Sequence, residues 1–83
     1  MIILVIGANG MLGNAVFRVL SENSDIKVFG TVRQTKAKRF FVPELASRLI
    51  DVEDLESENQ LKFLIEKVQP NIVVNCTALG KSK

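Results

Sequence analysis

Two hydrophobic periodicities alternate along this 83-residue chain. Short apolar runs, or apolar residues at every second position, are typical of strands buried in a sheet. They predict strands at residues 2–6, 26–32, 48–50 and 72–76. Between the strands, apolar residues recur at spacings of three and four, which indicates amphipathic helices over 11–20 and over a second stretch that ends near Val68. Residues 34–39 fit a short helix or a loop.

Each predicted helix has one apolar face that we expect to pack on the sheet. For the first helix, this face consists of Leu12, Ala15, Val16, Val19 and Leu20. For the second helix, it consists of Leu61, Leu64, Ile65 and Val68. The sequence allows two starting points for the second helix. Ser57 and Gln60 fit a capping box, while Asp54 fits a cap one turn earlier.

The alternation of strands and helices predicts an α/β fold with a parallel sheet and right-handed crossovers. We expect one domain over residues 1–83, the four-stranded half of a doubly wound Rossmann sheet with strand order 3-2-1-4 and flanking helices. In that order the first and fourth strands are neighbours. A ligand then binds at their carboxyl ends, where the strand order reverses.

Composition narrows the class of protein. Hydrophobic residues make up 47% of the chain, which indicates a globular domain, and the net charge of +2 gives no reason to expect a nucleic-acid or membrane partner. The apolar run at the N-terminus is too short for a signal peptide or a membrane span. The single cysteine allows no disulfide within the chain, which fits a reducing, cytoplasmic location. The sequence also indicates no metal site.

Three glycines, Gly7, Gly10 and Gly13, lie between the first strand and the first helix. Glycine lets the backbone turn sharply and lets a ligand approach without meeting a Cβ atom. The helix that follows offers unpaired N–H groups and the positive end of its dipole to an anion. The pattern favours a site for the phosphates of a dinucleotide. The alternative is a turn that only allows close packing of the helix on the strand.

The spacing G-x-x-G-x-x-G differs from the G-x-G-x-x-G dinucleotide fingerprint, and it resembles that of one protein family. The stretch Gly7-Ala8-Asn9-Gly10-Met11-Leu12-Gly13 is similar to the phosphate loop of the extended short-chain dehydrogenases/reductases. It is closest to the branch of the dTDP-4-dehydrorhamnose reductases, whose loops often read G-A-x-G-x-L-G. The resemblance implies an NAD or NADP cofactor whose pyrophosphate is held by Gly7, Asn9, Gly10, Met11, Leu12 and Gly13.

The end of the second strand indicates which cofactor is preferred. An NAD site usually has an acidic residue about 20 residues past the glycines, where it binds the ribose 2′-hydroxyl. This chain has Arg33 instead, and a guanidinium suits the 2′-phosphate of NADP. We therefore predict NADP, with NAD as the alternative. Lys36, Lys38 and Arg39 either add positive field to this site or form a solvated basic loop.

Two further segments fit the same resemblance. Asp51 and Val52 match the D-h-x-D pattern after the third strand, where h is apolar. The resemblance implies that the Asp51 carboxylate accepts from the adenine amino group and that the Val52 N–H helps to hold the ring. Residues 75–78 resemble an N-x-A-A-like segment beside the cofactor, which implies contacts from Cys76, Thr77 and Ala78. Because the chain has no histidine to activate Cys76 as a nucleophile, we interpret Cys76 as a buried small residue.

The catalytic pattern of the family is missing from these residues. In the family, a Ser or Thr and a Tyr-x-x-x-Lys pair follow the fourth strand, whereas this chain contains no tyrosine. We therefore expect the cofactor-binding, N-terminal part of an NADP-dependent reductase that acts on a 4-keto nucleotide sugar. One alternative is a nucleotide-sugar epimerase or dehydratase of the same superfamily. The other is a non-enzymatic NAD(P)-binding regulatory or sensing module.

A half-sheet of this kind leaves the outer edge of its fourth strand unpaired. Open strand edges present unpaired N–H and C=O groups to other chains. We therefore expect self-association through this edge.

Overall fold

The computed structural model describes residues 1–33, 35–52 and 57–76. The strands are β1 (Ile2–Ile6), β2 (Lys27–Val32), β3 (Leu49–Asp51) and β4 (Ile72–Asn75). The helices are α1 (Met11–Ser21), the 3-10 helix η1 (Thr35–Phe40), α2 (Pro43–Ala46) and α3 (Glu58–Val68). Every predicted strand is confirmed to within one residue at each end. The short helix α2 is an addition that the apolar spacing does not predict.

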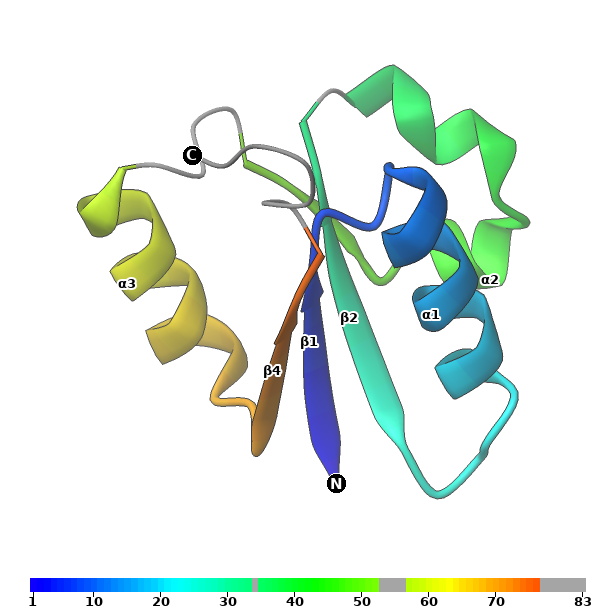
Figure 1. Cartoon of the computed structure of the whole chain (residues 1–83), viewed down its shortest axis with the longest axis horizontal. Helices are drawn as coiled ribbons and strands as arrows, with labels where there is room; N and C mark the ends of the chain where they lie inside the picture. The colour runs from blue at the N-terminus through cyan, green and yellow to red at the C-terminus, as the bar shows by residue number, and fades with distance from the viewer. Residues whose placement is uncertain (34, 53–56, 77–83) are drawn as a thin grey trace.

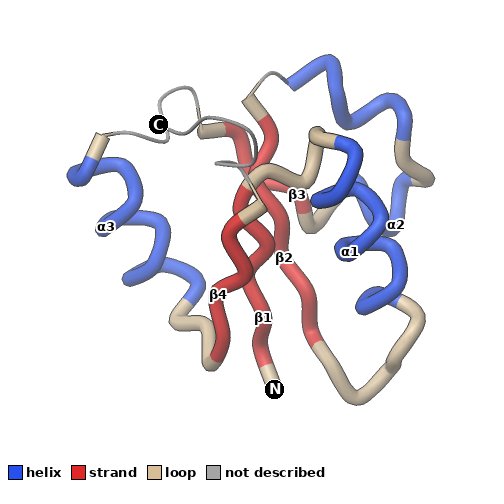
Figure 2. Tube along the Cα trace, viewed as in Figure 1, coloured by secondary structure: helices blue, strands red, loops and turns tan. Residues whose placement is uncertain are grey.

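The four strands are parallel and lie in the order β3-β2-β1-β4. This confirms the predicted α/β fold and its 3-2-1-4 strand order. Figure 2 shows β1 between β2 and β4, and the register places Val5 beside Gly30 on one side and Val74 on the other. The carboxyl ends of the strands therefore meet at one edge of the sheet, the carboxyl edge, which is far from the N-terminus in Figure 1.

Helices cover both faces of the sheet, with α1, η1 and α2 on one face and α3 on the other (Figure 1). The side chains of β1 alternate between these two layers. Val5 belongs to the same buried cluster as Phe17 of α1. Leu4 belongs to the cluster that contains Leu64 of α3. Within the described part of the chain, no helix is long and apolar enough to cross a membrane.

The buried face of α1 differs from the predicted one. Three residues that the apolar spacing assigns to the core are exposed: Leu12 by 49%, Val19 by 64%, and Ala15. The residues that turn toward the sheet are Gly13, Val16, Phe17 and Leu20. Compared with the prediction, α1 is rotated about its own axis. Gly13 lies directly against the main chain of Gly7, and this contact decides which side of α1 meets the sheet.

Ser57 caps α3, as one of the two predicted alternatives requires. Its side chain accepts a hydrogen bond from the Gln60 N–H at 3.3 Å. The other candidate cap, Asp54, lies outside the described residues. Leu64 is buried on the predicted apolar face, whereas Ile65, predicted to lie on the same face, is exposed.

Candidate functional site

β1 leads into α1 through a tight turn at residues 7–10, the glycine turn, at the carboxyl edge of the sheet (Figure 1). Gly7 has a φ of 89°, in the left-handed region that residues with a Cβ rarely adopt. The Gly10 N–H donates to the Gly7 carbonyl at 3.2 Å and closes the turn. Gly13 lies so close to the main chain of Gly7 that a Cβ atom on Gly13 would overlap the Gly7 carbonyl oxygen. The three glycines therefore form one joint between β1 and α1.

The start of α1 presents bare main chain. Gly10 is the N-cap residue, and among the residues that the structure describes no side chain caps the helix. The Asn14 N–H donates to the Gly10 carbonyl at 2.8 Å, which is the first bond of the helical ladder. The N–H groups of Met11 and Leu12 therefore have no partner within the helix. Because the helix dipole adds positive potential at this end, these groups are suited to hold a phosphate.

The structure brings the predicted residues of the glycine-rich segment together at this joint. Asn9 is exposed on the glycine turn, and the side chains of Met11 and Leu12 are exposed on the first turn of α1. All three residues are therefore accessible to a ligand at the carboxyl edge. The residues gathered here are Gly7, Asn9, Gly10, Met11, Leu12 and Gly13.

Charged side chains lie at the ends of β2, which pairs with β1, and of β3, the next strand in the sheet. Arg33 directly follows β2 and is exposed. Asp51 ends β3, where it is the register partner of Val32. The Lys38 ammonium of η1 lies 3.8 Å from an Asp51 carboxylate oxygen. The sequence left open whether Lys38 belongs to the site, and the structure places its charge beside the carboxylate that is predicted to bind adenine.

Val52 is used differently from its predicted role. Its N–H donates to the Val32 carbonyl at 2.9 Å, which continues the ladder between β2 and β3. Its side chain is buried in the cluster between the sheet and α3. Because this N–H is already bonded within the sheet, Asp51 is the residue of this pair whose side chain can reach an adenine.

The end of β4 lies beside the glycine turn because β4 pairs with β1. The Cys76 N–H donates to the Ile6 carbonyl at 2.9 Å and extends this pairing by one residue. Cys76 is half-buried and packs against the core cluster that contains Ala8 of the glycine turn. Thr77 and Ala78, the other two residues predicted to contact the cofactor here, lie outside the described residues.

Sequence reasoning missed Thr31, which binds the glycine turn from β2. Its hydroxyl oxygen accepts from the Gly7 N–H at 2.8 Å, and its carbonyl accepts from the Ala8 N–H at 2.8 Å. The available signal was a polar residue at the apolar end of a buried strand, directly before Val32.

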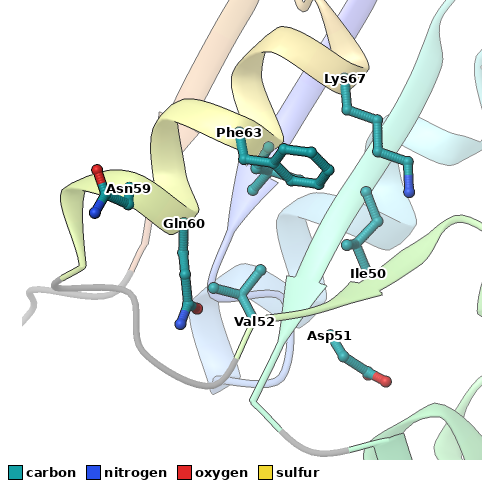
Figure 3. A pocket seen from close by; sticks show the side chains of 8 residues that line it. Ile50, Asp51, Val52, Asn59, Gln60, Phe63 and Lys67 are labelled. Atoms are coloured by element: carbon teal, nitrogen blue, oxygen red, sulfur yellow. The ribbon is translucent and has the colours of Figure 1, made fainter.

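A hollow of about 420 Å³ lies between β3 and α3 (Figure 3). In Figure 3, Phe63 and Lys67 extend from α3 toward Ile50 of β3. The hollow is lined by Ile50, Asp51, Val52, Asn59, Gln60, Phe63, Leu64 and Lys67. These residues belong to β3, to the position directly after it and to α3, and not to the glycine turn. The N–H groups suited to phosphate thus lie outside this hollow, at the carboxyl edge of the sheet.

The joint between β1 and α1 has the geometry of a dinucleotide phosphate site at the switch point of a parallel sheet. The model of the NAD dependent epimerase/dehydratase family matches residues 3–83 of the chain. The chain belongs to this family. A search of the curated proteins finds no match to the chain.

Membership of the epimerase/dehydratase family confirms the broad resemblance seen in the sequence, because this family is part of the extended short-chain dehydrogenase/reductase superfamily. Its members bind an NAD(P) dinucleotide. The match extends from β1 through β4 and so includes the glycine turn, Arg33 and Asp51.

Proposed function

We propose that this member of the epimerase/dehydratase family binds NADP at the glycine turn and serves as the cofactor-binding part of a reductase. The observation that carries the proposal is the uncapped start of α1, with Arg33 at the end of the neighbouring strand. The Met11 and Leu12 N–H groups suit a pyrophosphate. The Arg33 guanidinium suits a 2′-phosphate by its charge and by its fork of donors.

Other residues of the carboxyl edge suit the remaining parts of the dinucleotide. The Asp51 carboxylate, at the end of β3, can accept a hydrogen bond from the adenine amino group. Asn9 offers an exposed side-chain amide on the glycine turn. Cys76 has a small side chain, and two further small residues, Thr77 and Ala78, follow it in the sequence. Small side chains leave room for the dinucleotide. When bound, the dinucleotide supplies the hydride for reduction.

The proposed substrate is a 4-keto nucleotide sugar, and it rests on the resemblance of residues 7–13 to the dTDP-4-dehydrorhamnose reductases. The 83 residues contain no tyrosine, so a tyrosine acid for the carbonyl would have to come from outside them. An epimerase or dehydratase would use the same cofactor site. A Tyr-x-x-x-Lys sequence encoded beyond residue 83 favours an enzyme, and its absence favours a non-enzymatic sensing module.

Replacing Arg33 tests the cofactor preference. We expect the wild-type chain to bind NADPH more tightly than NADH in calorimetric titrations. Arg33→Ala removes the cation that directly follows β2, so we expect NADPH to bind about tenfold more weakly while NADH binding stays unchanged. Lys27→Ala, which removes an exposed cation at the start of the same strand, is the matched control and should alter neither affinity. Equal affinities of the wild type for the two dinucleotides would remove the case for NADP.

We further propose that the chain self-associates through β4. This strand ends the sheet, and its Ile72 and Val73 are exposed. We expect size-exclusion chromatography with light scattering to show a dimer that forms as concentration rises. Val73→Lys places a charge on the edge strand and should shift the chain toward a monomer. A wild-type monomer at every concentration would count against this contact.

A further inference from the structure

We propose that Thr31 is a positioning residue for dinucleotide binding. From β2, the strand beside β1, it sets the orientation of the glycine turn; this inference rests on the proposed function. Thr31 lies in β2 between Gly30 and Val32 and is 0% exposed. In the part of the chain that the structure describes, it is the one polar residue in the core. A buried hydroxyl is costly unless it is hydrogen-bonded, so its partner explains why it is there.

Thr31 holds both peptide groups that meet at Gly7. Its hydroxyl oxygen accepts at 2.8 Å from the Gly7 N–H, which belongs to the peptide before Gly7. Its main-chain carbonyl accepts at 2.8 Å from the Ala8 N–H, which belongs to the peptide after Gly7. The two dihedral angles of Gly7 are the rotations between these two planar peptides. The two bonds together therefore hold Gly7 at its left-handed φ of 89°.

The orientation of Gly7 determines where α1 begins. The peptide after Gly7 carries the Gly7 carbonyl, which accepts from the Gly10 N–H at 3.2 Å and lies against Gly13. A rotation at Gly7 would move the N-cap residue, Gly10, and with it the N–H groups that we assign to the pyrophosphate. The Gly7 N–H is itself bonded to the threonine hydroxyl, so it is not one of the phosphate donors.

The test compares Thr31→Val with Thr31→Ser. Valine keeps the shape of threonine and removes the acceptor, whereas serine keeps the hydroxyl. Each variant is titrated with NADPH, whose pyrophosphate reaches the glycine turn, and with adenosine 2′-monophosphate, which has no pyrophosphate. We expect Thr31→Val to weaken NADPH binding about tenfold and adenosine 2′-monophosphate binding by less than about twofold, while Thr31→Ser stays close to wild type for both.

The comparison of the two ligands separates positioning from general stabilisation. Equal losses for both ligands in Thr31→Val would overturn the inference, because a residue that only stabilises the fold affects both. Unchanged NADPH binding by a folded Thr31→Val variant would overturn it as well. If the wild-type chain binds no NADPH, the proposed function fails and this inference fails with it. If the wild type binds NADPH but the two ligands respond alike, this inference fails alone.

Amide hydrogen exchange of the wild-type chain keeps the inference testable if Thr31→Val does not fold. We expect the Gly7 N–H to be protected in the free protein, because Thr31 is its partner. The Met11 and Leu12 N–H groups should exchange quickly and become protected when NADPH is added. Rapid exchange at Gly7 in the free protein would show that Thr31 does not hold the turn.

Discussion

Replacing Gly13 with alanine is expected to displace α1 from the sheet and to abolish dinucleotide binding. The new Cβ atom would overlap the Gly7 carbonyl oxygen, and it would lie 2.7 Å from the Gly7 carbonyl carbon and 3.1 Å from the Ala8 Cα atom. All of these are main-chain atoms, so no side-chain rotation relieves the overlap. Overpacking of a core costs about 1–3 kcal/mol and more where the neighbours cannot yield, so we expect a loss of at least about 3 kcal/mol.

Gly10→Ala is the matched control for Gly13→Ala. At Gly10 a new Cβ would lie 3.6 Å from the Gly7 carbonyl oxygen, an ordinary contact, and the φ of −85° is open to any residue. We expect this variant to lose less than about 1 kcal/mol, the scale of a changed N-cap residue. Urea unfolding measures the stability of both variants, and NADPH titration measures the loss of binding in Gly13→Ala. Similar results for the two variants would contradict the steric account of the joint.

The sheet could be predicted from the sequence because its signals are local. An apolar run such as residues 2–6 indicates a strand without reference to any other part of the chain. Helices between successive strands then require parallel pairing with right-handed crossovers, which favours the order that the structure shows. The glycine spacing and its place between a strand and a helix likewise located the joint.

Apolar periodicity could not predict which face of α1 turns toward the sheet. Apolar periodicity counts side chains, and Gly13 has none, so the closest contact of the helix gives no signal in the pattern. That contact, with Gly7, turns Phe17 into the core and leaves Leu12 and Val19 exposed. The error in the predicted face therefore comes from a steric constraint that involves main-chain atoms.

Three features of the site that the sequence missed, left open or assigned differently depend on how elements lie beside one another. Thr31 holds the glycine turn only because β2 pairs with β1. Lys38 approaches Asp51 only because η1 lies beside the end of β3. The N–H of Val52 is bonded within the ladder between β2 and β3. The D-h-x-D resemblance gives no information about this bond. The spacing of a motif predicts which residues belong to a site. The pairing register of the strands decides which hydrogen-bonding groups of those residues are already bonded.

Phe17→Ala is expected to cause the largest loss of stability that a side-chain truncation can produce here. Phe17 is 0% exposed and contacts Phe41 edge-on, with ring centroids 5.6 Å apart. The guanidinium of Arg18 lies 4.5 Å from the centroid of the Phe41 ring, so the residues around Phe41 also depend on this packing. Truncating a buried phenylalanine costs about 3–5 kcal/mol. Small domains have a stability near the lower end of about 5–15 kcal/mol, so a large fraction of this variant should be unfolded without denaturant.

Phe63→Ala makes the same substitution on α3, where the side chain is 67% exposed, and is expected to cost less than about 1 kcal/mol. Urea unfolding of both variants, followed by circular dichroism, measures the difference. NADPH in excess should raise the midpoint of Phe63→Ala as it raises that of the wild type, because the ligand binds only the folded chain. Equal midpoints for the two variants would mean that α1 is not held on the sheet by Phe17. The N–H groups at the start of α1 would then lack the packing that keeps them at the carboxyl edge.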